Sequence, residues 1–213
     1  MVHLLLSTKL CFFKLFEMKF GISLREEPKP NKEDMILPFT QITKNVYLYK
    51  DYSNVFVVKK GNKAVLIDFA SGSVLEHLSK IGVEQVDYIL HTHHHRDQCH
   101  GDNIAVEQGI KIVVPWGERK LFSQANEFWK TRAYKHLYLF KPTYFTPIES
   151  IAVDLAVKAG DIFDWGGYQF KVVNSKGHTS GSISYVVEMD GESLAFTGDL
   201  IHSGGKTINY YDM

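Results

Sequence analysis

The feature of this chain that most constrains its fold is a histidine-rich stretch that directly follows an apolar segment. Residues 91–101 read HTHHHRDQCHG and hold five of the ten histidines in the 213-residue sequence. The segment before them, Val86–Leu90, has the apolar side chains of a buried strand. In open α/β sheets, binding sites form at the carboxyl ends of strands. The sequence therefore predicts a sheet in which one buried strand ends in this histidine cluster.

The spacing of side chains within the cluster indicates metal binding. His93 and His95 stand two residues apart, and Asp97 follows where a helix is expected to begin. Imidazole nitrogens and a carboxylate oxygen are ligands that suit zinc or a similar borderline metal. A solvated loop in which Asp97 caps the helix is the alternative, but it fits isolated histidines better than so dense a cluster. A zinc finger is disfavoured because Cys11 and Cys99 form no Cys-x₂-Cys pair.

The regular part of the chain reads as one α/β domain over residues 38–213. Apolar residues at helical spacing predict helices at Val74–Ile81 and Leu121–Trp129, with another between the histidine cluster and Gly109. Alternating or apolar β-forming runs predict strands at 46–49, 54–58, 64–67, 86–90, 112–114, 153–157, 168–173, 183–188 and 193–196. Strand, helix and strand in succession predict a βαβ crossover and a mixed sheet covered by helices.

Residues 1–37 are expected to form a tail and linker in front of this domain. Charged residues interrupt the apolar run Met1–Phe20, which therefore lacks the roughly 20 apolar residues of a membrane span. A signal peptide is disfavoured, because the basic residues lie within the apolar run and no small-x-small cleavage site follows. Two cysteines cannot form a disulfide framework, so we expect a reducing, cytoplasmic location.

The charge balance gives no global attraction to nucleic acid or to acidic membranes. Lysine and arginine total 24, aspartate and glutamate also total 24, and the formal net charge is zero. The 45% of hydrophobic residues is typical of an ordered globular domain. We therefore expect the partner to be a small-molecule substrate, with no nucleic acid and no membrane.

Four segments, in order along the chain, resemble motifs of the metallo-β-lactamase fold hydrolases. Val65–Asp68 (VLID) resembles their early strand with its supporting aspartate, and Thr92–Gln98 (THHHRDQ) resembles the His-x-His-x-Asp-His signature. Gly177–Tyr185 (GHTSGSISY) is similar to the Gly-His-Thr-x-Gly-Ser loop, and Phe196–Leu200 (FTGDL) to the Thr-Gly-Asp strand end. The four segments extend over nearly all of the regular part of the chain.

This resemblance implies a four-layer αββα sandwich with a metal site at one edge of two packed sheets. Three matching histidines would bind one metal ion: His93, His95 and His178. Asp97 would bind a second metal or position the attacking water, and Asp199 would bridge the two metals. Asp68 would support the histidine loop from behind. Taken alone, His178 fits a turn residue and Asp199 a strand end, but together with the first two histidines they supply a third ligand and a carboxylate.

Two departures from the family pattern concern the second metal. Gln98 stands where the signature has its last histidine, and a neutral amide oxygen is a weaker zinc ligand than imidazole. The family's final histidine ligand has no counterpart, since His202 lies too close to Asp199. We therefore expect one intact metal site and a second that is weak, altered or empty, with Gln98, Asp68 and His202 as second-site or supporting residues.

The same departure suggests that the fold is incomplete at its C-terminal side. A missing strand and helix would leave a sheet edge open, and such an edge allows a homo-oligomer to form. Arg96 is either solvated or contacts an anionic group of the substrate. Cys99 is expected to be a small buried residue, and His91 and His94 to be loop or supporting residues.

The function that the resemblance implies is metal-dependent hydrolysis of a small ester, thioester, lactone or lactam-type substrate. Zinc is favoured, with iron and manganese as alternatives. A metal-bound hydroxide would attack the substrate, and Asp97 would be the catalytic residue that orients it and takes its proton. Two other readings stay open: a mononuclear iron oxidoreductase on the same fold, and a non-catalytic metal-binding protein completed by a partner.

Overall fold

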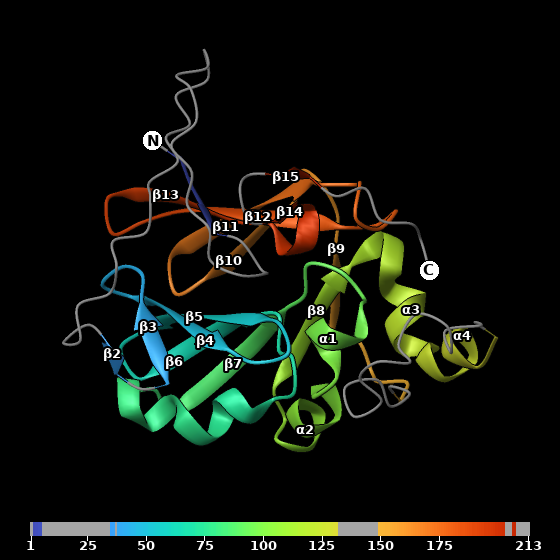
Figure 1. The fold of residues 1–213 in the computed structure, drawn as a ribbon, viewed down its shortest axis with the longest axis horizontal. Coiled ribbons are helices and arrows are strands. Elements are labelled where there is room, and N and C mark those ends of the chain that lie inside the picture. Colours follow the sequence, from blue (N-terminus) through green and yellow to red (C-terminus); the bar gives the residue numbers. More distant parts are fainter. Residues whose placement is uncertain (1, 6–34, 37, 132–148, 203–205, 208–213) are drawn as a thin grey trace, which may run out of the picture.

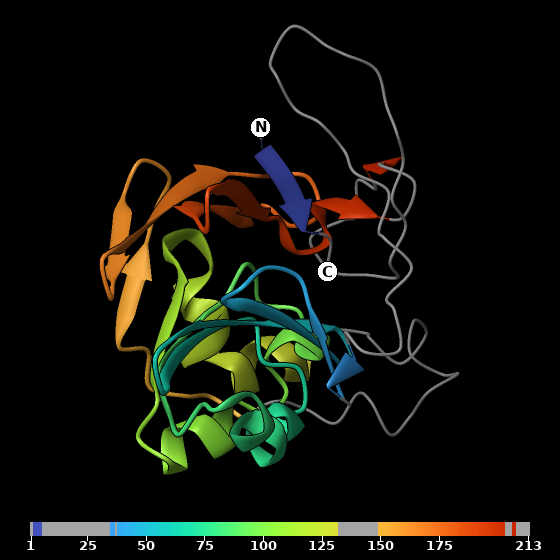
Figure 2. The ribbon, with the colours of Figure 1, turned by 90° about the vertical axis from the view of Figure 1, so that its left-hand side faces the viewer.

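Two β-sheets lie face to face in the computed structural model, which describes residues 2–5, 35–36, 38–131, 149–202 and 206–207. Figure 1 shows the five-stranded sheet above the eight-stranded one, and Figure 2 shows the same two layers from the side. Helices lie on the face of the larger sheet that points away from the smaller one. A separate two-stranded sheet joins β14 (Ile201–His202) to β15 (Lys206–Thr207).

The larger sheet changes from antiparallel to parallel pairing along its strand order. The strands, in spatial as well as chain order, are β2 (Met35–Ile36), β3 (Phe39–Gln41), β4 (Val46–Lys50), β5 (Asn54–Lys60), β6 (Lys63–Ile67), β7 (Gln85–Leu90), β8 (Lys111–Pro115) and β9 (Leu155–Val157). Pairs from β2 to β6 are antiparallel, and pairs from β6 to β9 are parallel. The predicted crossover is confirmed, because the parallel strands β7 and β8 are joined through helices.

The parallel strands are connected by short helices on one face. These are the 3₁₀ helix η2 (Ser73–Ile81), α1 (Arg96–Cys99), α2 (Asp102–Glu107), the 3₁₀ helix η3 (Trp116–Glu118), α3 (Arg119–Ser123) and α4 (Ala125–Thr131). The helix predicted at Val74–Ile81 is thus 3₁₀, the form that short helical segments often take. The helix predicted at Leu121–Trp129 is two helices, because Gln124 between them has φ −129° and ψ 32° and breaks the helical backbone.

The smaller sheet has the spatial order β1-β13-β12-β11-β10. Its strands are β1 (Val2–Leu5), β10 (Ile162–Trp165), β11 (Tyr168–Asn174), β12 (Ile183–Met189) and β13 (Glu192–Phe196). Strands β10 to β13 form an antiparallel meander. Sequence reasoning missed β10, whose four residues are too few for a clear alternation signal.

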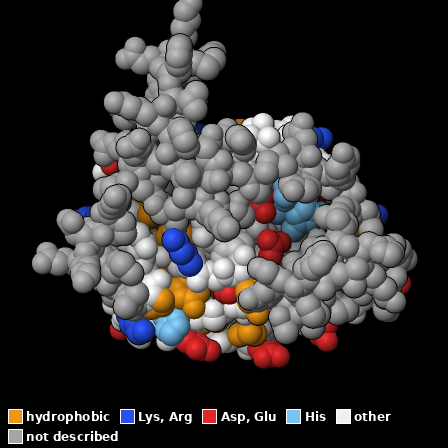
Figure 3. Space-filling view, in the orientation of Figure 1, with side chains coloured by type: hydrophobic (Ala, Val, Ile, Leu, Met, Phe, Trp, Pro, Cys, Tyr) orange, Lys and Arg blue, Asp and Glu red, His pale blue; other side chains and the backbone are white. Residues whose placement is uncertain are grey.

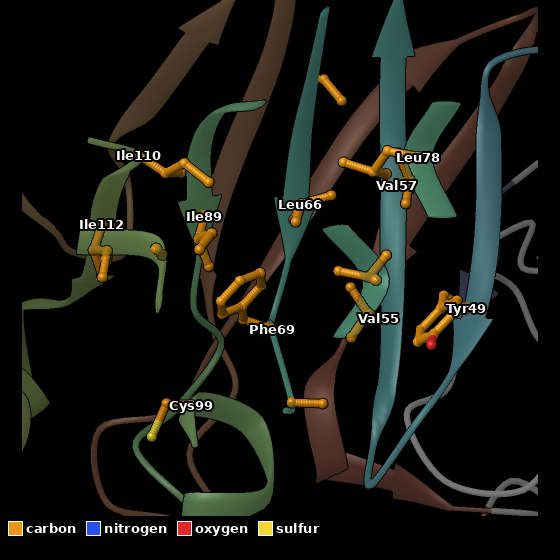
Figure 4. Close-up of a cluster of buried hydrophobic side chains, with 14 of the residues drawn as sticks. Tyr49, Val55, Val57, Leu66, Phe69, Leu78, Ile89, Cys99, Ile110 and Ile112 are labelled. Atoms are coloured by element: carbon orange, nitrogen blue, oxygen red, sulfur yellow. The ribbon is translucent and has the colours of Figure 1, made fainter. Parts of the chain in front are cut away.

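Strands β4 to β9 of the larger sheet contribute to two separate cores, because successive side chains point to opposite faces. On β5, Val55 and Val57 pack toward the helices, and Figure 4 shows them together with Leu78 of η2. Phe56 and Val58 of the same strand pack toward the smaller sheet. This inter-sheet core is built from hydrophobic side chains and holds the two sheets together.

The first 37 residues are not entirely outside the fold. β1 pairs in parallel with β13, from Val2 opposite Ser193 to Leu5 opposite Phe196, and β2 pairs with β3. β13 is therefore not an edge strand of the smaller sheet, and the open edge expected from a missing C-terminal strand stays a prediction. Residues 6–34 lie outside the described residues. The domain boundary at residue 38 and the oligomeric state stay predictions.

Three of the four predicted layers are present in the described part of the chain: helices, larger sheet and smaller sheet. The α/β class and the stacked sheets are confirmed. Among those residues no helix lies on the outer face of the smaller sheet (Figure 2). No helix in the described ranges has the length and apolar character needed to cross a bilayer.

Phe170→Ala tests the contribution of the inter-sheet core to stability. Phe170 is fully buried on β11, with its ring centroid 6.3 Å from that of Phe163. Truncation to alanine leaves a cavity, so we expect the free energy of unfolding to fall by about 3–5 kcal/mol in urea titrations. Val173→Ala is the control, because Val173 lies on the same strand with 44% of its surface exposed and should cost less than about 1 kcal/mol. Equal losses would contradict this assignment of the core.

Candidate metal centre

Five of the predicted site residues lie in segments that follow the carboxyl ends of strands. The strand ends bring together loops from both sheets: Asp68 follows β6, and His93 and His95 follow β7. From the smaller sheet, the loop between β11 and β12 carries His178, and the 3₁₀ helix η6 (Gly198–Leu200) after β13 carries Asp199. The face-to-face packing of the sheets makes these loops meet.

Three histidines converge on one point. Ligand atoms of His93, His95 and His178 all lie within 4.8 Å of one another. The ring centroids are 4.8 Å apart for His93 and His95, 4.7 Å for His93 and His178, and 4.6 Å for His95 and His178. At most 7% of each residue is exposed. The structure therefore brings together the three residues that the sequence predicted as ligands of one metal.

The chemistry of these imidazoles fits a bound metal ion. The Nε2 atoms of His93 and His95 are buried and have no hydrogen-bond partner within the described residues. Burial, followed by the neighbouring histidines, lowers the pKa of both rings well below its usual value. Both rings are therefore neutral near pH 7, and a neutral imidazole nitrogen is the form that binds metals. A metal ion would satisfy polar atoms that are otherwise costly to bury.

Asp68 fixes the orientation of His93 through Thr92. The Asp68 carboxylate accepts hydrogen bonds from the Thr92 backbone N–H and from the Thr92 hydroxyl, both at 2.9 Å. The Thr92 oxygen lies 3.0 Å from Nδ1 of His93. Since the hydroxyl hydrogen points to Asp68, Nδ1 of His93 has to be the donor in this second contact. Nε2 of His93 then carries the lone pair and faces the other two histidines.

His91 also supports the loop and lies outside the histidine triad. Its Nε2 is 3.0 Å from the Asp102 carboxylate, and its Nδ1 is 3.5 Å from Asp68. Burial acts to lower the pKa of His91, but Asp102 and then Asp68 outweigh it and raise this pKa to about 9. The ring packs on Phe122 with centroids 5.1 Å apart. This agrees with the prediction that His91 is a supporting residue.

Two carboxylates adjoin the triad. Oδ2 of Asp199 lies 3.6 Å from Nε2 of His178 and 4.0 Å from Nε2 of His93. Burial, then repulsion from Asp97 and Asp68, raises the pKa of Asp199 well above its usual value. Desolvation and the Asp68 charge likewise raise the pKa of Asp97 to about 6, although Arg96 opposes them. A nearby divalent cation would reverse such shifts, because it favours the ionised carboxylates.

The other predicted residues have varied surroundings. Gln98 is fully buried, and its side chain lies near enough to Asp199 to lower the pKa of that carboxyl. Arg96 is only 2% exposed, so its reading as a solvated residue is wrong, and a contact with substrate stays a prediction. Cys99 is buried as expected, and burial raises the pKa of its thiol. The backbone of His202 lies in β14, and its side chain is outside the described residues.

Sequence reasoning missed Glu118, which contacts both histidine loops. One carboxylate oxygen of this fully buried residue accepts the His94 backbone N–H at 2.6 Å and lies 2.9 Å from His94 Nδ1. The other oxygen accepts the Gly181 N–H at 3.2 Å and the Thr179 hydroxyl. A single glutamate after a strand is usually solvated, so the sequence carries no signal for this role.

A cavity of about 740 Å³ adjoins the two histidine loops. His94 lines it from one loop and Ser180 from the other, and Trp116, Arg119 and Lys120 line its remaining walls. On the face drawn in Figure 3, histidine side chains gather beside acidic ones near the level where the two sheets meet. The size of the cavity suits a small-molecule ligand.

Comparison with known proteins identifies the family. A family model described as the metallo-beta-lactamase superfamily matches residues 48–212. The chain belongs to the metallo-β-lactamase superfamily. This match covers all four motifs, and the superfamily's metal-binding character agrees with the histidine triad.

Curated relatives within this superfamily carry the name hydroxyacylglutathione hydrolase. The protein from Brucella ovis is 28% identical over 121 residues, which are 56% of this chain and 35% of that protein. The protein of the same name from Brucella abortus gives the same values. The chain therefore spans about a third of the length of the curated relatives it matches.

Solved metallo-β-lactamases share the fold. MIM-2 metallo-β-lactamase superposes with a TM-score of 0.62 at 17% identity, covering 80% of this chain and 63% of that one. FEZ-1 from Legionella gormanii gives 0.59 at 19%, covering 82% and 70%. The metallo-β-lactamase of Cronobacter sakazakii, described by a HARLDQ motif, gives 0.62 at 19%, covering 80% and 68%. That motif ends in Asp-Gln, as residues 93–98 (HHHRDQ) do here.

Gly198→Ala tests how closely the Asp199 segment must approach the histidine loop. Gly198 has φ +54°, and a Cβ atom there would lie 2.5 Å from the Thr92 hydroxyl oxygen. Strain and overpacking should together lower the free energy of unfolding by about 2–4 kcal/mol in urea titrations. Gly191→Ala is the control: with φ +79° and open space around it, it should cost only about 1–2 kcal/mol. If Gly198→Ala lowers the free energy of unfolding no more than Gly191→Ala does, the Thr92 side chain can move away and the close approach is not required.

Proposed function

We propose that this superfamily member is a metal-dependent hydrolase of a small carbonyl substrate. The observation that carries the proposal is the buried triad of His93, His95 and His178, in which two Nε2 atoms lack hydrogen-bond partners among the described residues. Three protein ligands with an open fourth position are typical of catalytic zinc sites, whereas structural sites are closed by four. The names of the curated relatives agree with hydrolysis.

The triad would hold one zinc ion, with Asp199 beside it. When bound, the metal would lower the pKa of a water molecule to about 7 and polarise the carbonyl oxygen of the substrate. Asp68 and Thr92 keep His93 in the tautomer that presents Nε2. Iron and manganese are alternatives, and a second metal position next to Asp97, Asp199 and Gln98 would be weak.

Asp97 would act on the attacking water. Its carboxylate belongs to the same acidic group as Asp199 and Asp68, since the Asp68 charge raises the pKa of Asp97, and both charges raise the pKa of Asp199. The Asp97 backbone is fixed, because its carbonyl accepts a hydrogen bond of 2.9 Å from the Ser53 hydroxyl. A carboxylate of this acidic group would orient the attacking hydroxide and take its proton as the tetrahedral intermediate collapses.

The substrate we favour is a small thioester or ester with an acidic group. The 740 Å³ cavity beside His94 and Ser180 offers Arg119 and Lys120 for an anion, and Trp116, 61% exposed, for an apolar part. Hydroxyacylglutathione, which the curated relatives are named for, is a thioester with free carboxylates. Lactone and lactam substrates use the same chemistry and are alternatives. A cytoplasmic location, argued from the two cysteines, is part of this proposal.

His95→Ala tests the metal centre. Loss of one of three ligands should remove bound metal, and hydrolysis of a thioester should fall by at least about 100-fold. Metal content is measured by elemental analysis of the purified protein, and activity is measured on the same sample. His77→Ala is the matched control, because this histidine stacks on Tyr49 at 5.7 Å and lies outside the triad.

The metal content and activity of the purified wild-type protein distinguish the proposed hydrolase from the alternative functions. Stoichiometric zinc with thioesterase activity supports the proposal. Purified wild-type protein without stoichiometric metal would contradict it. Stoichiometric iron with oxygen-dependent turnover would instead favour the mononuclear iron oxidoreductase.

The double variant Arg119→Ala/Lys120→Ala tests the acidic substrate. We expect the KM for hydroxyacylglutathione to rise about tenfold, while kcat changes little, because the cations contact a part of the substrate remote from the carbonyl. The KM for an uncharged thioester should stay within about twofold. Lys80→Ala, at an exposed lysine of η2, controls for the loss of a positive charge. An equal rise for both substrates would contradict recognition of the anion.

A further inference from the structure

The metal centre depends on two loops that belong to different sheets. The segment 91–95 follows β7 of the larger sheet, and the segment 175–182 joins β11 to β12 of the smaller one. Backbone pairing between them includes the Ile183 N–H, which donates to the Thr92 carbonyl at 3.0 Å. That hydrogen bond lies five residues from His178, so contacts nearer to the ligands are needed to hold His178 at a constant distance from His93 and His95.

Glu118 supplies contacts at the required place. It ends η3, directly after β8, the neighbour of β7 in the larger sheet. One oxygen holds His94, which stands between His93 and His95, and the other holds Thr179 and Gly181. One carboxylate thus bridges the two loops within one residue of the ligands on both sides.

The surroundings of Glu118 show that this bridge is specific. Burying an ionised carboxylate is costly unless donors replace its water, and here two backbone N–H groups, a hydroxyl and a ring nitrogen surround it. Gly181 leaves no space for a side chain, because a Cβ atom there would lie 2.4 Å from Cγ of Glu118. The loop between β11 and β12 therefore approaches the carboxylate as closely as a backbone can.

We propose that Glu118 is a positioning residue of the metal centre, which sets the distance between His178 and the pair His93 and His95. The proposal rests on the proposed metal centre and extends it to a residue whose hydrogen bonds reach the chain neighbours of the expected ligands. Its effect passes through His94 on one side and Thr179 on the other. Loss of either arm would let one loop shift relative to the other and misplace a ligand.

Glu118→Gln tests the bridge with little change in size. The amide NH₂ of glutamine would face donors on one side, so one arm is lost while the other is kept. We expect the zinc affinity of the folded protein to fall about 10- to 100-fold, as is typical when partners of metal ligands are removed. Affinity is measured by competition with a chromophoric chelator, and bound cobalt is used as a spectroscopic probe of ligand geometry. Glu84→Gln, at an exposed glutamate bonded to Asn62 at 2.7 Å, should change neither readout.

Thr179→Val and Thr179→Ser separate positioning from a general loss of stability. Valine removes the hydroxyl that donates to Glu118, and serine keeps it. Valine should weaken zinc binding and shift the cobalt spectrum in the same direction as Glu118→Gln, whereas serine should keep affinity within about threefold of wild type. This pair keeps the proposal testable if Glu118→Gln does not fold.

The outcomes separate this proposal from the one it rests on. The positioning role is overturned if wild-type protein binds zinc and folded Glu118→Gln binds it with the same affinity and the same cobalt spectrum. Where Glu118→Gln does not fold, the same result for Thr179→Val overturns it. Equal affinities for Thr179→Val and Thr179→Ser would overturn it too. If wild-type protein itself binds no metal, the metal centre fails, and the positioning role fails with it.

Discussion

The packing of the two sheets against each other determines whether this site exists, because its ligands come from both. His93 and His95 end a strand of the larger sheet, and His178 and Asp199 follow strands of the smaller one. The core between the sheets is built from apolar side chains such as Phe170. Hydrophobic burial has no direction of its own, so it holds the layers together but does not fix the loops to within a fraction of an ångström. That precision has to come from polar contacts at the strand ends.

Those polar contacts form two systems, one built on Asp68 and one on Glu118. Asp68, with φ +57°, turns back from β6 to hold Thr92 and through it His93. Glu118 holds His94 and the loop of His178 from the other side. Buried carboxylates of this kind are costly, and they are retained in proteins where each oxygen is satisfied by donors. Asp68 and Glu118 therefore act as acceptors that orient the two loops carrying the triad.

The sequence predicted the parts of this arrangement that have a local signal. Strands such as β5, and the crossover from β7 to β8, follow from side-chain periodicity and turn residues. The spacing of His93 and His95 indicates a metal site, and the resemblance to the metallo-β-lactamase motifs adds His178. Glu118 could not be predicted, because its role depends on a loop more than 60 residues away in sequence. The pairing of β1 with β13 was missed for the same reason: a parallel partner distant in sequence leaves no local pattern. Non-local contacts are what the sequence alone conceals.

The replacement of the family's histidine by Gln98 would change the ligand chemistry of a second metal position. Gln98 is fully buried beside Asp199, where an imidazole would offer a soft nitrogen ligand and an amide offers a neutral oxygen. Burial and then the charges of Asp97 and Asp68 raise the pKa of Asp199, and burial and the charge of Asp68 raise the pKa of Asp97. A position formed from carboxylate and amide oxygens suits a harder cation than the position formed by three imidazoles, which suits zinc. The two positions would therefore differ in metal preference as well as in affinity, and filling the first need not fill the second.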